Sequence, residues 1–238
     1  MREFGWFLWR QLQSSVFPLF LFASMAATLA LPTEIPRYDA LLLLCILFQS
    51  SMFANKLESI REIGVICVFH LLGLCLEMYK VRHGSWSYPD AGYKISGVPF
   101  YSGFMYAGVA SYMMQAWKRF DLQLKNWPSW PLLLTVCAAI YANFFFSASI
   151  GDYRWLILGL LAVIFARCSV QFSTLPGMRR EMPMPVSFLL IGLFVWFAEH
   201  LSTYLRAWQY PYQQESWTLV DAGKISSWTM MVILSFSL

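Results

Sequence analysis

Charged side chains are scarce in this sequence. Of its 238 residues only 13% are Asp, Glu, Lys or Arg, whereas 58% are hydrophobic and 18% are aromatic. Soluble domains carry about a quarter charged residues, and the mean hydropathy here is +0.53. So little polar surface excludes a disordered chain and a coiled coil, and it argues against a soluble enzyme. The composition predicts a multi-pass helical membrane protein.

Paired cysteines and common catalytic signatures are also absent. The five cysteines form no C-x-x-C pair and stand in no ligand spacing with a histidine, which argues against a disulfide framework and a metal site. No glycine-rich phosphate-binding loop and no G-x-S-x-G motif occurs. The 17 Lys and Arg residues are scattered between apolar runs. We therefore expect no nucleic acid partner, and the sequence predicts no particular cofactor.

Eight apolar runs are candidate membrane-spanning helices, since about 20 mainly apolar residues cross a bilayer. They cover roughly residues 11–31, 38–54, 60–80, 99–117, 131–148, 153–171, 187–205 and 223–238. Counting Lys and Arg on alternate sides gives ten against seven in favour of a cytoplasmic N-terminus. We expect an all-α membrane protein, a single membrane domain over residues 1–238, with both termini in the cytoplasm.

A motif of the form E-x8-W-x-Y-P occurs twice, 122 residues apart. Its residues are Glu77, Trp86, Tyr88 and Pro89 in the first copy, and Glu199, Trp208, Tyr210 and Pro211 in the second. D-A-G-Y-K-I-S at 90–96 follows the first copy, and D-A-G-K-I-S at 221–226 follows the second. The pattern predicts two copies of a four-helix unit, repeat A at 9–118 and repeat B at 131–238. Four spans return the chain to its starting side, so the copies are parallel.

Titratable groups in the predicted spans are candidate site residues, because charges inside a membrane are costly and usually functional. Glu77 and Glu199 are the candidate catalytic residues. Gly73 and Glu77 stand on one helix face with His70, at spacings close to one and two turns. The candidate substrate-binding residues are His70, Trp86, Tyr88, Trp208, Tyr210 and Lys224. Two alternatives remain: the aromatic residues would suit an interfacial belt, and Lys224 would reach the headgroups.

Several segments resemble a family of bacterial membrane proteins. They are Glu77 to Lys80, G-S-W-S-Y-P-D at 84–90, G-V-P at 97–99, G-F-M-Y at 103–106, A-E at 198–199, W-x-Y-P at 208–211 and G-K-I-S-S-W at 223–228. The sequence is similar over nearly its whole length to the family catalogued as domain of unknown function 817. The resemblance implies a polytopic protein of the bacterial inner (plasma) membrane and no activity. A more distant likeness, carried by the G-V-P at 97–99 after a helical Glu, is to carotenoid-biosynthesis membrane proteins.

Three functions are compatible with these residues. The first is an enzyme that binds or modifies an isoprenoid, a pigment or another lipid in a pocket between the repeats, with Glu77 and Glu199 as acids and the motif aromatics stabilising a carbocation. The second is a transporter of a small molecule or ion, in which both glutamates bind a cation, a proton or an amine. The third is a subunit of a membrane complex or homo-oligomer, in which the motifs are structural. Membrane lipid is an expected partner in all three.

Overall fold

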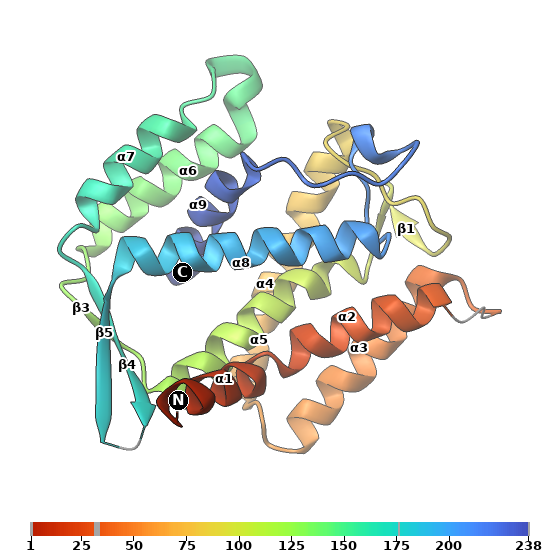
Figure 1. The fold of residues 1–238 in the computed structure, drawn as a ribbon. Helices are drawn as coiled ribbons and strands as arrows, with labels where there is room; N and C mark the ends of the chain where they lie inside the picture. Colours follow the sequence, from red (N-terminus) through yellow and green to blue (C-terminus); the bar gives the residue numbers. More distant parts are fainter. Residues whose placement is uncertain (1, 31–33, 176, 238) are drawn as a thin grey trace. The chain divides into compact units, whose positions relative to one another are not determined.

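The computed structural model describes residues 2–30, 34–175 and 177–237, and most of them are helical (Figure 1). Its helices are α1 (Arg2–Ser14), α2 (Val16–Ala30), α3 (Arg37–Ala54), α4 (Ile60–Arg82), α5 (Ser102–Phe120), α6 (Trp130–Ile150), α7 (Arg154–Ile164), α8 (Met184–Tyr204), the 3-10 helix η1 (Pro211–Gln213) and α9 (Lys224–Ser237). Its strands are β1 (Lys94–Ile95), β2 (Val98–Pro99), β3 (Gln123–Lys125), β4 (Ser169–Leu175) and β5 (Met178–Pro183). The predicted spans 11–31 and 223–238 end on residues that lie outside the described ones.

Four described helices, α3, α4, α6 and α8, are long and apolar enough to cross a membrane, or up to five if the bent pair α1–α2 counts as one span. Only 22–28% of the residues in the apolar stretches of these four helices are buried within the chain. Apolar side chains therefore cover most of their outer surface, as expected of helices that face lipid. The helices α5 and α9 coincide with the predicted spans 99–117 and 223–238, but they do not satisfy the requirements of length and apolar composition together.

The first predicted span, 11–31, is broken. Helix α1 ends at Ser14, α2 begins at Val16, and the two helices are bent by 65°. Pro18 explains the break, because it has no N–H to donate to the Ser14 carbonyl and its ring clashes with that carbonyl. Within α2, Pro18 lies in the first turn, where a proline is tolerated.

The predicted span 153–171 is wrong as a continuous helix, and the chain is mostly rather than wholly helical. Helix α7 is 11 residues long, and Ser169 begins β4, which pairs with β3 and β5 in an antiparallel sheet of order β3-β4-β5. Polar and apolar residues alternate through most of S-V-Q-F-S-T-L, and this period favours a strand.

On β5, Glu181 accepts hydrogen bonds from Ser169, Gln171 and Lys125, which lower its pKa to about 2.

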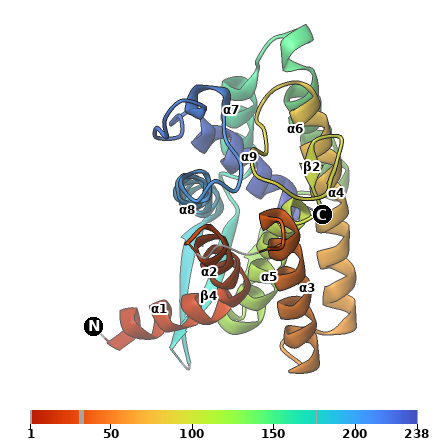
Figure 2. The same cartoon turned by 90° about the vertical axis from the view of Figure 1, so that its right-hand side faces the viewer.

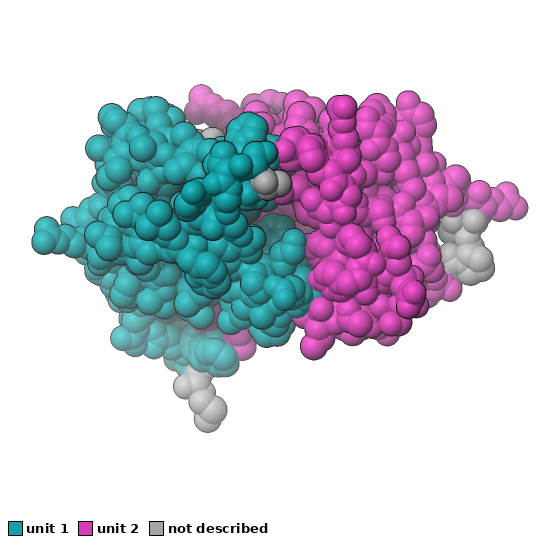
Figure 3. Space-filling model, turned by 90° about the horizontal axis from the view of Figure 1, so that it is seen from above, with its two compact units in different colours: residues 1–6, 120–199, 220–238 teal, residues 7–119, 200–219 magenta. Residues whose placement is uncertain are grey.

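Two compact units divide the chain (Figure 3). Unit 1 comprises residues 1–6, 120–199 and 220–238, and unit 2 comprises residues 7–119 and 200–219. The core of unit 1 includes Phe165 and Phe188, whose rings meet edge to face at 5.2 Å between centroids. The loop after α8 therefore folds with unit 2, although α8 itself begins in unit 1.

In unit 2, α2 and α3 lie side by side (Figures 1 and 2). Phe20 on α2 stacks on Phe48 of α3 with ring centroids 3.8 Å apart. Phe17, which is fully buried, also contacts Phe48 and stacks on Phe104 of α5. These rings join α2, α3 and α5 through apolar contact alone.

Two glycines allow α4 and α5 to pack closely. A Cβ atom at Gly73 would lie 2.3 Å from Cδ2 of Tyr106, and one at Gly103 would lie 2.6 Å from Cε1 of His70. Carbon atoms in contact are about 3.5–4.0 Å apart, so neither position has room for a side chain. Gly73 lies on the predicted face with His70, and the group that approaches it is a tyrosine ring.

We expect Gly73→Ala to lower the free energy of unfolding by about 1–3 kcal/mol, because the added methyl group must displace Tyr106. Gly64→Ala on the same helix is the matched control, since nothing lies within 4 Å of its added Cβ. The control should be neutral or stabilise the helix by up to about 1 kcal/mol. Unfolding of the detergent-solubilised protein measures both changes, and equal effects would contradict this packing.

Candidate functional site: the glutamate and aromatic cap of unit 2

Glu77 lies near the C-terminal end of α4 and is only 3% exposed. Its Oε2 accepts hydrogen bonds from Nε1 of Trp86 at 2.6 Å and from the hydroxyl of Tyr88 at 2.7 Å. Its Oε1 accepts a hydrogen bond from the hydroxyl of Tyr106 on α5, also at 2.7 Å. An ionised carboxylate only accepts hydrogen bonds, so these three donors suit it. Glu77 thus attaches both the first W-x-Y-P loop and α5 to α4.

Tyr88 is held as a permanent donor to Glu77. Burial raises the pKa of the Tyr88 phenol well above its ordinary value, and the neighbouring Glu77 charge raises it further. The hydroxyl group therefore keeps its proton at physiological pH. The Tyr88 ring also meets the rings of Tyr38 and Tyr101 edge to face, at 5.9 and 6.3 Å between centroids.

The two W-x-Y-P motifs pair with each other inside unit 2. Ser87 and Gln209, which hold the same place in the two motifs, form an antiparallel bridge with both backbone hydrogen bonds at 2.9 Å. Reciprocal bonds between equivalent residues give the bridge a local twofold symmetry. The Trp86 ring meets Tyr210 edge to face at 6.1 Å between centroids. We call the two paired loops, 83–101 and 205–219, the cap.

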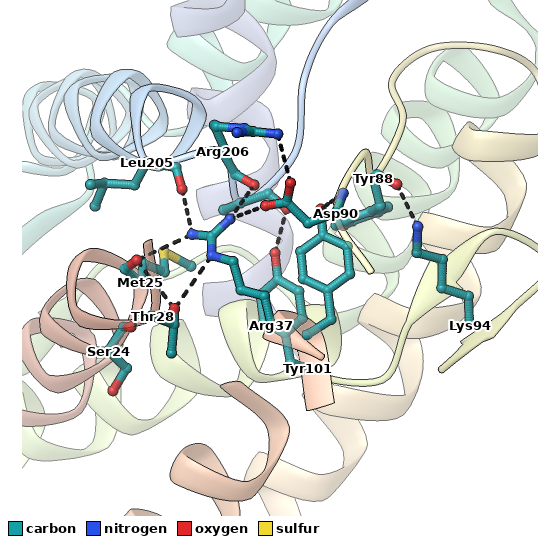
Figure 4. Close-up of polar contacts among 12 residues, drawn as sticks. Ser24, Met25, Thr28, Arg37, Tyr88, Asp90, Lys94, Tyr101, Leu205 and Arg206 are labelled. Carbon is teal, nitrogen blue, oxygen red and sulfur yellow. Dashed lines mark hydrogen bonds and ion pairs between the residues drawn. The ribbon is translucent and has the colours of Figure 1, made fainter. Parts of the chain in front are cut away.

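Arg37, the first residue of α3, fastens the cap to two helix ends (Figure 4). Its guanidinium group has five N–H bonds and makes five hydrogen bonds here. The acceptors are the Thr28 hydroxyl, the Asp90 carboxylate and the backbone carbonyls of Met25, Leu205 and Arg206. Leu205 and Arg206 directly follow the end of α8, where backbone carbonyls lack a partner within the helix and favour a cation. Asp90 also pairs with Arg206 at 2.7 Å, so one carboxylate joins both loops of the cap.

Two further polar contacts close the cap. The hydroxyl of Tyr101, which is fully buried, donates a hydrogen bond to the carbonyl of Ala207. Nζ of Lys94 donates to the carbonyl of Tyr88 at 2.6 Å and lies 5.2 Å from the centre of the Tyr38 ring. Each loop is therefore held by side chains as well as by the backbone bridge.

The second glutamate, Glu199, belongs to unit 1 and is also 3% exposed. Its Oε2 accepts a hydrogen bond from Nε1 of Trp228 on α9 at 2.6 Å. Trp228 follows Glu199 by 29 residues, the same separation that relates Tyr106 to Glu77. Lys224, the first residue of α9, interacts electrostatically with Glu199.

The structure therefore brings together some of the predicted site residues. Trp86 and Tyr88 contact Glu77 directly, while Trp208 and Tyr210 are buried in the same cap. Among the described residues, no group of three His, Cys, Asp or Glu side chains could hold a metal ion.

His70 points to α5 rather than to the carboxylate. Its ring lies against Gly103 and meets Phe104 edge to face at 4.6 Å. Its Nδ1 atom is buried and has no hydrogen-bond partner among the described residues. Packing is therefore the role that the contacts of His70 support.

Sequence reasoning missed the roles of Arg37, Asp90 and Trp228. Nothing in the local sequence around Arg37 indicates partners as far away as residue 206. Trp228 had a usable signal: it stands 122 residues after Tyr106, the same offset that separates the two glutamates.

Replacing Arg37 tests the fastening of the cap. We expect Arg37→Lys to lower the free energy of unfolding by about 2–3 kcal/mol, because an ammonium group has three donors and leaves acceptors of the cap unsatisfied. Arg61→Lys is the control, since Arg61 is exposed on α4. Denaturation in detergent should separate the two variants. A difference smaller than about 0.5 kcal/mol, the usual range for surface changes, would contradict this role.

Comparison with known proteins identifies the family but no activity. The sequence matches the family described as Protein of unknown function (DUF817) over residues 3–236. It is 49% identical over 232 residues to the Uncharacterized protein YoaT of Bacillus subtilis (strain 168), covering 97% of this chain and 88% of that protein. No solved structure matches the chain significantly. These matches do not support the likeness to carotenoid-biosynthesis proteins. The chain belongs to the DUF817 family.

Proposed function

We propose that this protein is a multi-pass protein of the bacterial inner membrane, with cytoplasmic termini, that acts as a membrane-embedded binding or assembly subunit. Its apolar outward-facing helices support the membrane location. The observation that carries the proposal is the state of Glu77, which is buried and bound by three donors, two of them from the cap. In this proposal the glutamate motifs are structural.

Acid catalysis on a lipid is less well supported by the same contacts. A catalytic acid needs a proton to give and access to its substrate. Both oxygens of Glu77 accept hydrogen bonds, and Trp86 and Tyr88 direct their polar atoms to it. Stabilisation of a carbocation requires ring faces turned toward the reacting group. The arrangement therefore favours a clamp over an acid in an aromatic pocket.

We propose in addition that the chain arose from two parallel four-segment copies. Helices α4 and α8 end at Arg82 and Tyr204, and helices α5 and α9 begin at Ser102 and Lys224. Each of these pairs is separated by the 122 residues that separate the motifs. The segments before the motifs differ, because the 18-residue α3 corresponds to the 11-residue α7 followed by a β-hairpin. The duplication is supported best where the motifs lie.

A structural role for Glu77 predicts that Glu77→Gln destabilises the protein by about 1–3 kcal/mol. An amide presents one acceptor oxygen and one donor nitrogen, so at least one of Trp86, Tyr88 and Tyr106 loses its acceptor. Thermal unfolding in detergent measures the change. Glu215→Gln is the control, because Glu215 is exposed. An unfolding temperature equal to that of the parent would contradict the clamp and restore the acid hypothesis.

A carrier is the second candidate, and the break between α1 and α2 favours it. Discontinuous membrane helices form the binding sites of many transporters. Proton flux into proteoliposomes, driven by a potassium diffusion potential and followed with a pH-sensitive dye, tests this function. A proton flux that exceeds the flux into empty liposomes and that is lower for the Pro18→Ala variant would support the carrier. Flux equal to that of empty liposomes would leave the binding or assembly role.

A further inference from the structure

An open hollow of about 500 Å³ lies in unit 2 beside the connection between α3 and α4. Its lining comes from the end of α3, the connection, the start of α4 and Lys118 near the end of α5. Arg37 begins α3 and Glu77 lies near the end of α4, so the cap lies at the opposite ends of these two helices. The hollow is therefore independent of the glutamate clamp.

The residues that line the hollow include Glu58, a buried carboxylate with no ion-pair partner in the described part of the chain. Glu58 is 2% exposed, accepts hydrogen bonds from the Gln49 amide and the Ser111 hydroxyl, and lines the hollow. Neither donor is charged, and no ion pair with Glu58 occurs among the described residues. A carboxylate offers about four acceptor positions. Acceptor positions that the two donors do not use can accept hydrogen bonds from an ammonium group. A buried charge is costly unless paired, so Glu58 favours a cationic ligand group.

Lys56 places an available positive charge in the same lining. Its side chain is exposed, and its ammonium group has no partner among the described residues. Its backbone has φ of 58°, the left-handed conformation that ends α3, and the N–H of Leu57 bonds to the Met52 carbonyl at 3.0 Å. Lys118, by contrast, already pairs with Glu62 at 2.6 Å. Lys56 and Glu58, neither of which forms an ion pair among the described residues, therefore both line the hollow.

We propose that this hollow binds the headgroup of a phospholipid that carries both a phosphate and an ammonium group, such as phosphatidylethanolamine. The phosphate lies against Lys56 and the ammonium group against Glu58. The connection joins two helices that are long enough to cross a membrane; with the membrane location proposed above, on which this inference rests, the hollow lies at headgroup depth. Phe53, which is 47% exposed and lines the hollow, offers an apolar surface for the start of the acyl chains.

Native mass spectrometry of the detergent-purified full chain tests this site with added phosphatidylethanolamine and phosphatidylglycerol. We expect the chain to retain phosphatidylethanolamine more strongly. Lys56→Gln should reduce that retention about fivefold, which corresponds to about 1 kcal/mol for one basic residue near headgroups. Arg61→Gln is the matched control, because it removes an exposed positive charge close by that does not line the hollow.

Equal retention of the two lipids, or equal losses in the two variants, would overturn the proposal. Inorganic phosphate and free phosphoethanolamine are added as competitors, to distinguish binding of a lipid from binding of a soluble compound with the same phosphate and ammonium groups. Displacement of the lipid by either compound at equal concentration would contradict a lipid site. Failure of this site leaves the role of Glu77 unaffected, since that role is measured by unfolding at the other end of the helices.

Discussion

A carboxylate buried in an apolar helix has to be given hydrogen-bond donors, and this requirement organises unit 2. Burying a charged group without hydrogen-bond partners costs several kcal/mol. Trp86 and Tyr88 can reach Glu77 only if the loop after α4 folds back over the helix end. Once folded back, that loop presents Ser87 to Gln209, which brings in the loop after α8. The clamp thus explains how segments more than 100 residues apart form one cap.

Much of the helical structure was predictable, because apolar runs determine where long helices form. The predicted starts of α3, α4 and α6 lie within one residue of those observed. Two of the departures have local causes: Pro18 breaks the first run, and polar–apolar alternation in 169–175 favours a strand. Apolar content alone does not distinguish a continuous helix from a broken helix or a strand. The position of proline and the period with which polar and apolar residues alternate do distinguish them.

The site was predictable only in part. Spacing along a helix placed Gly73 and Glu77 on one face, and the repeated motif singled out the aromatic residues of the cap. Spacing could not assign their roles, since a Trp beside a Glu serves equally as a hydrogen-bond donor and as a wall for a cation. Nor could it find Arg37, whose acceptors lie up to 169 residues away in the sequence. The contacts add what spacing could not: Trp86, Tyr88 and Tyr106 all donate hydrogen bonds to Glu77, and the proposed structural role of the motif rests on these bonds.

The cap depends on the pairing of its two motifs, and an engineered disulfide tests whether they pair. Hydrogen-bonded residues of an antiparallel pair have Cα atoms about 5.5 Å apart, a distance that a disulfide spans. We expect Ser87→Cys combined with Gln209→Cys to form an intramolecular disulfide on mild oxidation, identified by mass spectrometry of the linked peptides. Ser87→Cys combined with Glu215→Cys, a loop position without this pairing, should link far less. Equal linkage in the two double variants, or none between positions 87 and 209, would show that the two loops do not pair in this way.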